Sequence, residues 1–379
     1  MLFPYTYVTH SMEKMQDYLD FIFFEVWCQA RDDLDYDIEM LFVGNDDLRI
    51  MISELYTSEL QGANFFLTGL QQIFEDFKQL SDRQIDQLKN MCRANNDIES
   101  ACSGRDDVVP VTYADINLIS EDLSNHLQAF YKNLYSQSFL SLQSIQSRIG
   151  EIDSHYRDFM TTNIQGKCPF CGIHDIKGIY HTKREAYDHF LPKGQYPFNT
   201  INFHNLVPAC HECNSSYKLV ADPLSHSKNP LASQKGMRRK ALYPFTTAQY
   251  TIELAITLNV NDWTALTPDE IEIDAGHAAM GEEIDTWLDI YDIEERYKAK
   301  CCSESDGKGW IREVVDESQN YGQTPLQFLN GKLKTADNQP WVDANFLKKP
   351  FLEACRNQGV FGSLPNNKRK QYQNTQPGS

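Results

Sequence analysis

Near the middle of the chain lie three short sequences: CPFC (168–171), YDHFLPK (187–193) and FHNLVPACHECNSSYK (203–218). The first and the last each contain a CxxC pair, so two tight turns supply four thiols. Pairs of this spacing are typical of a tetrahedral zinc site with no open coordination position, which makes the zinc structural. The alternative is four unrelated buried thiols. The predicted zinc ligands are Cys168, Cys171, Cys210 and Cys213.

The 38 residues between the two pairs have a pattern of their own. Apolar residues flank Asp188 and His189, which is the pattern of a strand end where both polar groups can reach one site, and Pro192 stops the strand. A second short strand is expected over 205–207 and a helix from Asn214 to Lys218. The predicted order is therefore strand, loop, strand and helix, clamped by the cysteine pairs.

Charge singles out the same part of the chain. Residues 1–160 hold 27 acidic and 11 basic side chains, whereas residues 165–245 hold 5 acidic and 11 basic ones. The whole chain has a formal net charge of −18, which argues against non-specific nucleic-acid binding by the entire surface. The basic segment also contains six of the ten histidines. The chemistry is therefore expected within residues 165–245.

In this window the sequence resembles the HNH endonucleases, which have a ββα-metal fold and a flanking four-cysteine zinc site. The first His is His189, the middle Asn is Asn205, and the third position is Asn214 instead of His. The resemblance covers about residues 165–225. A weaker resemblance extends to HNH proteins of Septu-like anti-phage systems, which are encoded beside an ATPase. It rests on Tyr243-Pro244-Phe245 and on the block from Trp287 to Tyr297.

The resemblance implies a role for each motif residue. Asp188 and Asn214 would bind one divalent ion through oxygen atoms, and a site with so few protein oxygens suits Mg²⁺ or Mn²⁺. His189 would be the general base that activates water. Asn205 would orient the loop that carries His189. The alternative for the Asp-His pair is a structural role, as polar side chains at a strand end whose hydrogen bonds are made within the protein.

Substrate contacts are expected from basic residues beside the motif. Lys193 and Lys218 are candidates for phosphate contact, and His204 is a candidate for the lining of the cleft. The implied substrate is DNA, and the implied reaction is hydrolysis of phosphodiester bonds.

The rest of the chain predicts a mainly helical α+β protein. Apolar residues at helical spacing (Leu70, Ile73, Phe74 and Phe77) and candidate caps at Ser81 and Ser120 predict helices before residue 164, with a loop over 95–112. Strands are expected over 250–258 and 271–274, and helices over about 278–300, 324–334 and 341–357. The predicted divisions are an acidic helical domain that docks a partner (1–164), an HNH domain (165–245), a C-terminal α+β domain (246–365) and a disordered tail (366–379).

The expected setting is cytoplasmic, because the most apolar N-terminal run, Phe21 to Trp27, is short and contains Glu25, so no membrane association is expected. The favoured function is a metal-dependent endonuclease in anti-phage defence, working in a complex with an ATPase. The main alternative is a non-catalytic, zinc-stapled module that binds nucleic acid or protein. A cysteine hydrolase is a third possibility without a local motif.

Overall fold

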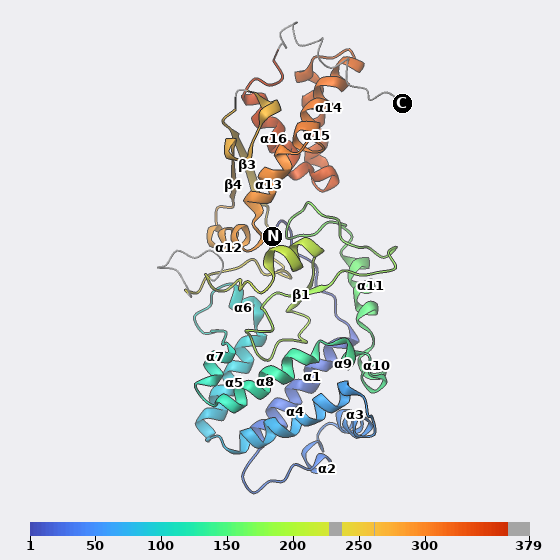
Figure 1. The fold of residues 1–379 in the computed structure, drawn as a ribbon, viewed down its shortest axis with the longest axis vertical. Coiled ribbons are helices and arrows are strands. Elements are labelled where there is room, and N and C mark those ends of the chain that lie inside the picture. Colours follow the sequence, from blue (N-terminus) through green and yellow to red (C-terminus); the bar gives the residue numbers. More distant parts are fainter. Residues whose placement is uncertain (227–236, 261, 363–379) are drawn as a thin grey trace. The chain divides into compact units, whose positions relative to one another are not determined.

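The computed structural model describes residues 1–226, 237–260 and 262–362 (Figure 1). The chain divides into two compact units. The first contains residues 1–250 and 282–291, and the second contains residues 251–281 and those from 292 onward. Helices predominate in the described residues, and the strands form two separate antiparallel pairs, so the fold is mainly helical α+β as predicted.

The N-terminal part of the first unit is a helical bundle. Helix α4 packs against α8, and the apolar stripe of α4 is fully buried, with Leu70 and Phe77 inaccessible to solvent. Trp27 stacks against Phe77 and donates a hydrogen bond to the Leu70 carbonyl (3.0 Å). The bundle helices are α1 (Lys14–Phe21), α2 (Ile38–Leu41), α3 (Asp46–Tyr56), α4 (Gln61–Lys78), α5 (Asp82–Asn96), α6 (Ile98–Cys102), α7 (Tyr113–Asn117), α8 (Glu121–Leu134), α9 (Gln137–Leu140), α10 (Gln143–Ile149) and α11 (Ile152–Thr162).

The predicted helix caps of this bundle are confirmed. Ser81 and Gln84 form a capping box at the start of α5, and the Ser120 hydroxyl accepts a hydrogen bond from the Leu123 amide at the start of α8. The predicted loop over 95–112 is wrong in part, because α6 lies within it. The side chain of Asp97 accepts a hydrogen bond from the Ser100 amide and so caps this short helix.

The cysteine-containing segment folds in the predicted order. Strand β1 (Tyr187–His189) pairs antiparallel with β2 (Leu206–Pro208), with His189 opposite Leu206. A short helical segment of π type, η4, follows at Cys213–Lys218. The two strands are only three residues long, but Tyr187, Leu206 and Val207 are buried in the core.

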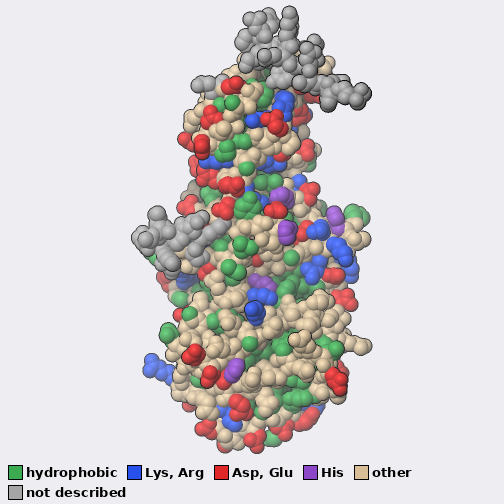
Figure 2. Space-filling model, viewed as in Figure 1, with side chains coloured by type: hydrophobic (Ala, Val, Ile, Leu, Met, Phe, Trp, Pro, Cys, Tyr) green, Lys and Arg blue, Asp and Glu red, His purple; other side chains and the backbone are tan. Residues whose placement is uncertain are grey.

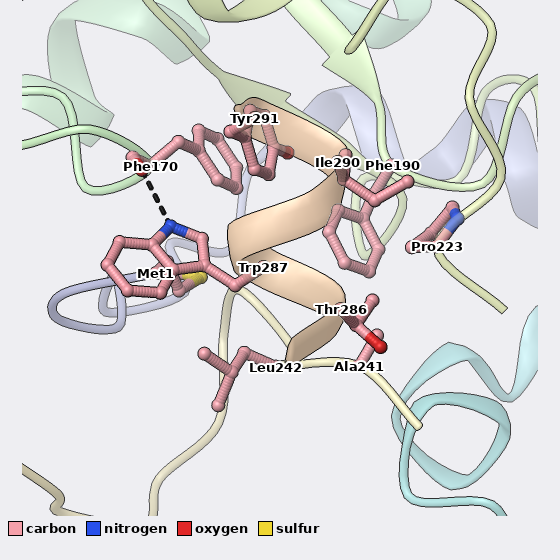
Figure 3. Close-up of a pocket in the computed structure, with 10 residues that line it drawn as sticks. All are labelled: Met1, Phe170, Phe190, Pro223, Ala241, Leu242, Thr286, Trp287, Ile290 and Tyr291. Carbon is pink, nitrogen blue, oxygen red and sulfur yellow. Dashed lines mark hydrogen bonds between the residues drawn. The ribbon is translucent and has the colours of Figure 1, made fainter. Parts of the chain in front are cut away.

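Helix α12 (Gly281–Tyr291) packs against the first cysteine turn although it lies over 100 residues further along the chain (Figure 3). The indole of Trp287 donates a hydrogen bond to the Phe170 carbonyl (2.7 Å), and the ring of Tyr291 stacks on that of Phe170. Both side chains are almost fully buried. Helix α12 therefore supports the turn that presents Cys168 and Cys171.

In its described residues, the second unit combines a two-stranded sheet with the α-helices α13 (Ile293–Cys302), α14 (Gly307–Asn320), α15 (Pro325–Asn338) and α16 (Asn345–Asn357). Strands β3 (Glu253–Leu258) and β4 (Ile271–Gly276) lie where two strands were predicted, and they pair antiparallel. The helix predicted over 278–300 is two helices, because Asp292 has a positive φ (47°) that interrupts α12 and α13. The predicted disordered tail, 366–379, lies outside the described residues. Within the described chain, every helix is too short or too polar to cross a membrane.

Candidate metal centre and polar site

The four paired cysteines converge on one point. The sulfur atoms of Cys168, Cys171, Cys210 and Cys213 all lie within 4.8 Å of one another, and all four residues are buried. The Sγ atoms of Cys171 and Cys210 are 3.9 Å apart. A tetrahedral zinc ion with Zn–S bonds of 2.3 Å requires sulfur–sulfur separations of about 3.8 Å. The donor set and its spacing therefore fit a structural zinc ion.

The backbone around the cysteines favours metal-bound sulfur. The Gly172 amide donates to the Cys168 carbonyl (2.7 Å), and Gly172 has a positive φ (66°), which closes the first turn tightly. The amide of Cys213 lies 3.5 Å from Sγ of Cys210, so it can donate to that sulfur. Burial raises the pKa of the Cys168 and Cys213 thiols, so a cation is needed to hold them as thiolates.

Asp188 lies at the centre of strand β1 and forms a buried ion pair. One carboxylate oxygen accepts from the Lys218 ammonium group (3.0 Å), and this lysine also donates to the His189 carbonyl (2.9 Å). The Lys218 side chain has no exposed surface. Burial raises the pKa of Asp188, while the charge of Lys218 opposes that rise. The second oxygen, Oδ2, is buried and has no hydrogen-bond partner among the described residues.

His189 is held by a backbone carbonyl. Its Nε2 atom lies 3.0 Å from the Thr200 carbonyl oxygen, which can only accept, so Nε2 carries the hydrogen and Nδ1 keeps its lone pair. The Tyr135 ring meets the imidazole edge-on, with centroids 4.8 Å apart. Burial lowers the pKa of His189 to about 3, with the charge of Lys193 as the next cause. The imidazole is therefore neutral at pH 7.

Asn205 fixes the chain directly after His189. Its side-chain oxygen accepts from the Leu191 amide (2.7 Å), and its side-chain nitrogen donates to the Leu191 carbonyl (3.0 Å). Its own carbonyl accepts from the Phe190 amide (2.9 Å). This fully buried residue therefore holds the strand-to-loop junction by three hydrogen bonds, two through its side chain and one through its backbone carbonyl.

The loop between β1 and β2 is anchored in the helical bundle, which the sequence did not predict. Phe198 is fully buried, and its ring contacts those of Phe23 and Tyr131. Asn199 donates to the carbonyl of Asn95 (3.0 Å) at the end of α5. Phe198 also has a positive φ (77°), which is unusual for a bulky residue and is maintained by this packing. The bundle thus sets the position of the loop that contains Thr200.

The remaining predicted residues occupy different surroundings. Asn214 lies in η4, directly after the second cysteine turn, and is partly exposed. His204 is exposed, stacks on Tyr7 and hydrogen-bonds to the hydroxyl of Tyr243 (3.0 Å), so its partners are not those of His189. Lys218, predicted to contact phosphate, is instead buried against Asp188, where it is inaccessible to a phosphate in this conformation.

The surface charge in Figure 2 agrees with the uneven distribution along the chain. On the face shown, acidic side chains predominate over the N-terminal helices at the bottom of the view. Lys and Arg side chains gather at mid-height, next to histidines, over the region that Figure 1 colours green. On this face, basic and imidazole groups thus gather in the part of the first unit that contains β1.

Comparison with known proteins gives one partial match. Protein ea31 of Escherichia phage lambda is 43% identical to this chain over 64 residues, which cover 17% of this chain and 19% of the phage protein. The similarity is therefore local in both proteins. No protein-family profile matches the chain, and no solved structure matches it significantly.

Proposed function

We propose that the protein is a metal-dependent HNH endonuclease that hydrolyses phosphodiester bonds in DNA. The single observation that carries the proposal is that consecutive residues of strand β1 supply an imidazole held in one tautomer and a buried carboxylate with an oxygen that has no partner among the described residues. A module that only binds nucleic acid needs the cysteines but has no use for an imidazole held in one tautomer.

His189 fits the role of general base. Because the Thr200 carbonyl holds Nε2–H, the unprotonated Nδ1 is available to accept a proton from water. The Tyr135 ring restricts rotation of the imidazole. Asn205 supports the same orientation through the backbone of Leu191, so it acts on His189 without touching the substrate.

Asp188 fits the role of a metal ligand. Its buried Oδ2 has no partner among the described residues, and an oxygen donor of this kind suits Mg²⁺ or Mn²⁺. Asn214, which follows the second cysteine turn, would supply a second oxygen. When bound, the ion would stabilise negative charge on the phosphate and the leaving oxygen. Lys218 would keep the other Asp188 oxygen in place.

We further propose that the nuclease works in anti-phage defence, in a complex with an ATPase. Two features support this: the Septu-like sequence resemblance and the strongly acidic N-terminal bundle. Most of the bundle surface would repel DNA, so it is better suited to docking a protein. Co-purification of the tagged chain with an ATPase from its native host would test this part.

The decisive experiment compares His189→Ala with the wild type on plasmid, single-stranded DNA and RNA, with Mg²⁺, Mn²⁺ or EDTA. Removal of a general base lowers rates by about 10²–10⁴-fold. His211→Ala is the matched control, because His211 is an exposed histidine of the second cysteine turn. Equal cleavage by His189→Ala and the wild type would exclude the mechanism.

The alternative function is a non-catalytic, zinc-stapled binding module. The observation that favours it is the Asp188–Lys218 pair, since a carboxylate neutralised by a buried lysine also makes sense as a structural clamp. Mn²⁺ binding separates the two functions without an activity assay. The nuclease requires one Mn²⁺ in addition to zinc, detectable by electron paramagnetic resonance and lost in Asp188→Ala, whereas the clamp requires none.

A further inference from the structure

The last turn of α8 reaches the polar site from the helical bundle. The Lys193 ammonium group donates to the carbonyl of Lys132 in this turn (3.3 Å). The same ammonium group lies 5.6 Å from the centroid of the Tyr135 ring, and that ring contacts the imidazole of His189. The backbone of Lys132, the ammonium group of Lys193, the Tyr135 ring and the His189 imidazole therefore form a continuous series of contacts between two segments that are about 60 residues apart.

The charges of the two lysines are not balanced within the chain. Lys132 and Lys193 have no ion-pair partner among the described residues, although the chain carries a formal net charge of −18. By contrast, Lys14, Lys78 and Lys89 of the same bundle each pair with a carboxylate. Burial lowers the pKa of Lys193, and the charge of Lys132 lowers it further. Two cations whose charges repel each other, neither paired with a carboxylate among the described residues, favour binding of an anion.

We propose that Lys132 and Lys193 together bind one backbone phosphate of the nucleic-acid substrate next to His189. This inference rests on the proposed nuclease function and extends it, because it makes the helical bundle part of the substrate site. Lys132 is exposed and Lys193 is partly exposed, so both ammonium groups can reach a phosphate on the surface. A flexible lysine binds phosphate as a point charge and needs no fixed geometry.

A purely local role for these lysines gives a different expectation. A lysine in the last turn of a helix interacts favourably with the unpaired carbonyls at the helix end, and Lys193 donates to one of them. If this were their whole role, removing Lys132 would change the stability of α8 and leave nucleic-acid binding unchanged. Affinity and its salt dependence therefore distinguish the two roles.

The experiment measures the dissociation constant of a 20-base-pair DNA duplex in EDTA, over a series of NaCl concentrations, for the wild type, Lys132→Ala, Lys193→Ala and the double variant. Each phosphate contact contributes about 0.9 to the slope of log K against log salt. We expect each single variant to weaken binding several-fold with little change in slope, because the remaining lysine still contacts the phosphate. Only the double variant should lose this contact and lower the slope by about 0.9.

The matched control is Lys78→Ala, since Lys78 lies in the last turn of α4 in the same bundle and pairs with Glu75. Lys132→Ala binding with the affinity and slope of Lys78→Ala would overturn the inference, and so would the absence of duplex binding by the wild type. The cleavage assay with His189→Ala judges the proposed function separately. An inactive His189→Ala with normal binding by Lys132→Ala would reject only the phosphate site.

Discussion

The carbonyl oxygen of Thr200 lies 3.0 Å from Nε2 of His189 and fixes the tautomer of that imidazole. Thr200 follows two residues, Phe198 and Asn199, whose side chains are buried against the helical bundle. The orientation of His189 therefore depends on packing in another part of the first unit. The loop therefore connects the packing of the bundle to the orientation of His189.

The first prediction concerns Phe198. Phe198→Ala should destabilise the protein by about 3–5 kcal/mol, because it removes a buried ring and leaves a cavity. Phe198→Gly should be about 1 kcal/mol more stable than Phe198→Ala, since glycine tolerates the positive φ (77°) at this position and alanine does not. Chemical denaturation of both variants gives the comparison.

This order is the reverse of the usual preference for alanine over glycine, so it tests the backbone conformation directly. An Ala variant more stable than the Gly variant would contradict the positive φ of Phe198. Both variants should also cleave more slowly than the wild type at temperatures where they remain folded, because the Thr200 carbonyl is less firmly placed. Phe139→Ala, in a part of the bundle distant in sequence from this loop, is a control for general loss of a buried ring.

The second prediction concerns the buried ion pair. Lys218→Met should destabilise the protein by about 3–5 kcal/mol in EDTA, because Asp188 would be left as an uncompensated buried charge. The double variant Lys218→Met/Asp188→Asn should recover most of this loss. The free energies of unfolding of the four proteins form a double-mutant cycle. Additive effects in this cycle would show that the two groups do not interact.

The third prediction concerns acid stability. Burial lowers the pKa of His155 to about 4, with the charge of His10 as the next cause, whereas an exposed histidine has a pKa near 6.5. His155 packs against Phe203, and its Nδ1 atom hydrogen-bonds with the Tyr187 hydroxyl. Its contribution to stability is thus fully present above pH 6.5 and is lost as pH falls toward 4, because only the unfolded chain takes up the proton.

Between pH 7.5 and pH 5, the wild type should lose about 2 kcal/mol more stability than His155→Gln, whose side chain does not titrate. Urea denaturation of both proteins at each pH measures the difference, and effects of all other groups cancel in it. Parallel pH profiles for the two proteins would show that His155 is not a buried neutral histidine.

Local patterns predicted the parts of the structure that depend on neighbouring residues. The CxxC spacing predicted two sulfurs on each turn, because each turn needs only its own residues to point them the same way. The four-ligand requirement of zinc predicted that the two turns meet, as they do. The alternation of apolar and polar residues breaks after His189, which correctly predicted the end of β1. Ser120, as a candidate cap, correctly predicted the start of α8. The short strand β2 followed from the same reasoning.

The parts that could not be predicted depend on contacts between distant segments. A lysine after a motif is ordinarily exposed, and the burial of Lys218 arises from a carboxylate 30 residues away. The positive φ of Phe198 has no sequence signal, since glycine or asparagine would be expected there. Lys132 was missed because it lies in the helical bundle, and only the fold brings it to Lys193.

The final prediction concerns zinc. Purified protein should contain about one tightly bound zinc ion per chain, and Cys213→Ser should lose it, since three remaining sulfurs cannot complete the tetrahedral site. Metal-binding energy is folding energy in such sites, so Cys213→Ser should also unfold at a lower temperature. The control is Cys302→Ser, because Cys302 is a partly exposed cysteine outside the four-cysteine cluster. Elemental analysis should find about one zinc ion per chain in Cys302→Ser. The same zinc content in Cys213→Ser would contradict the assignment of the four cysteines as zinc ligands.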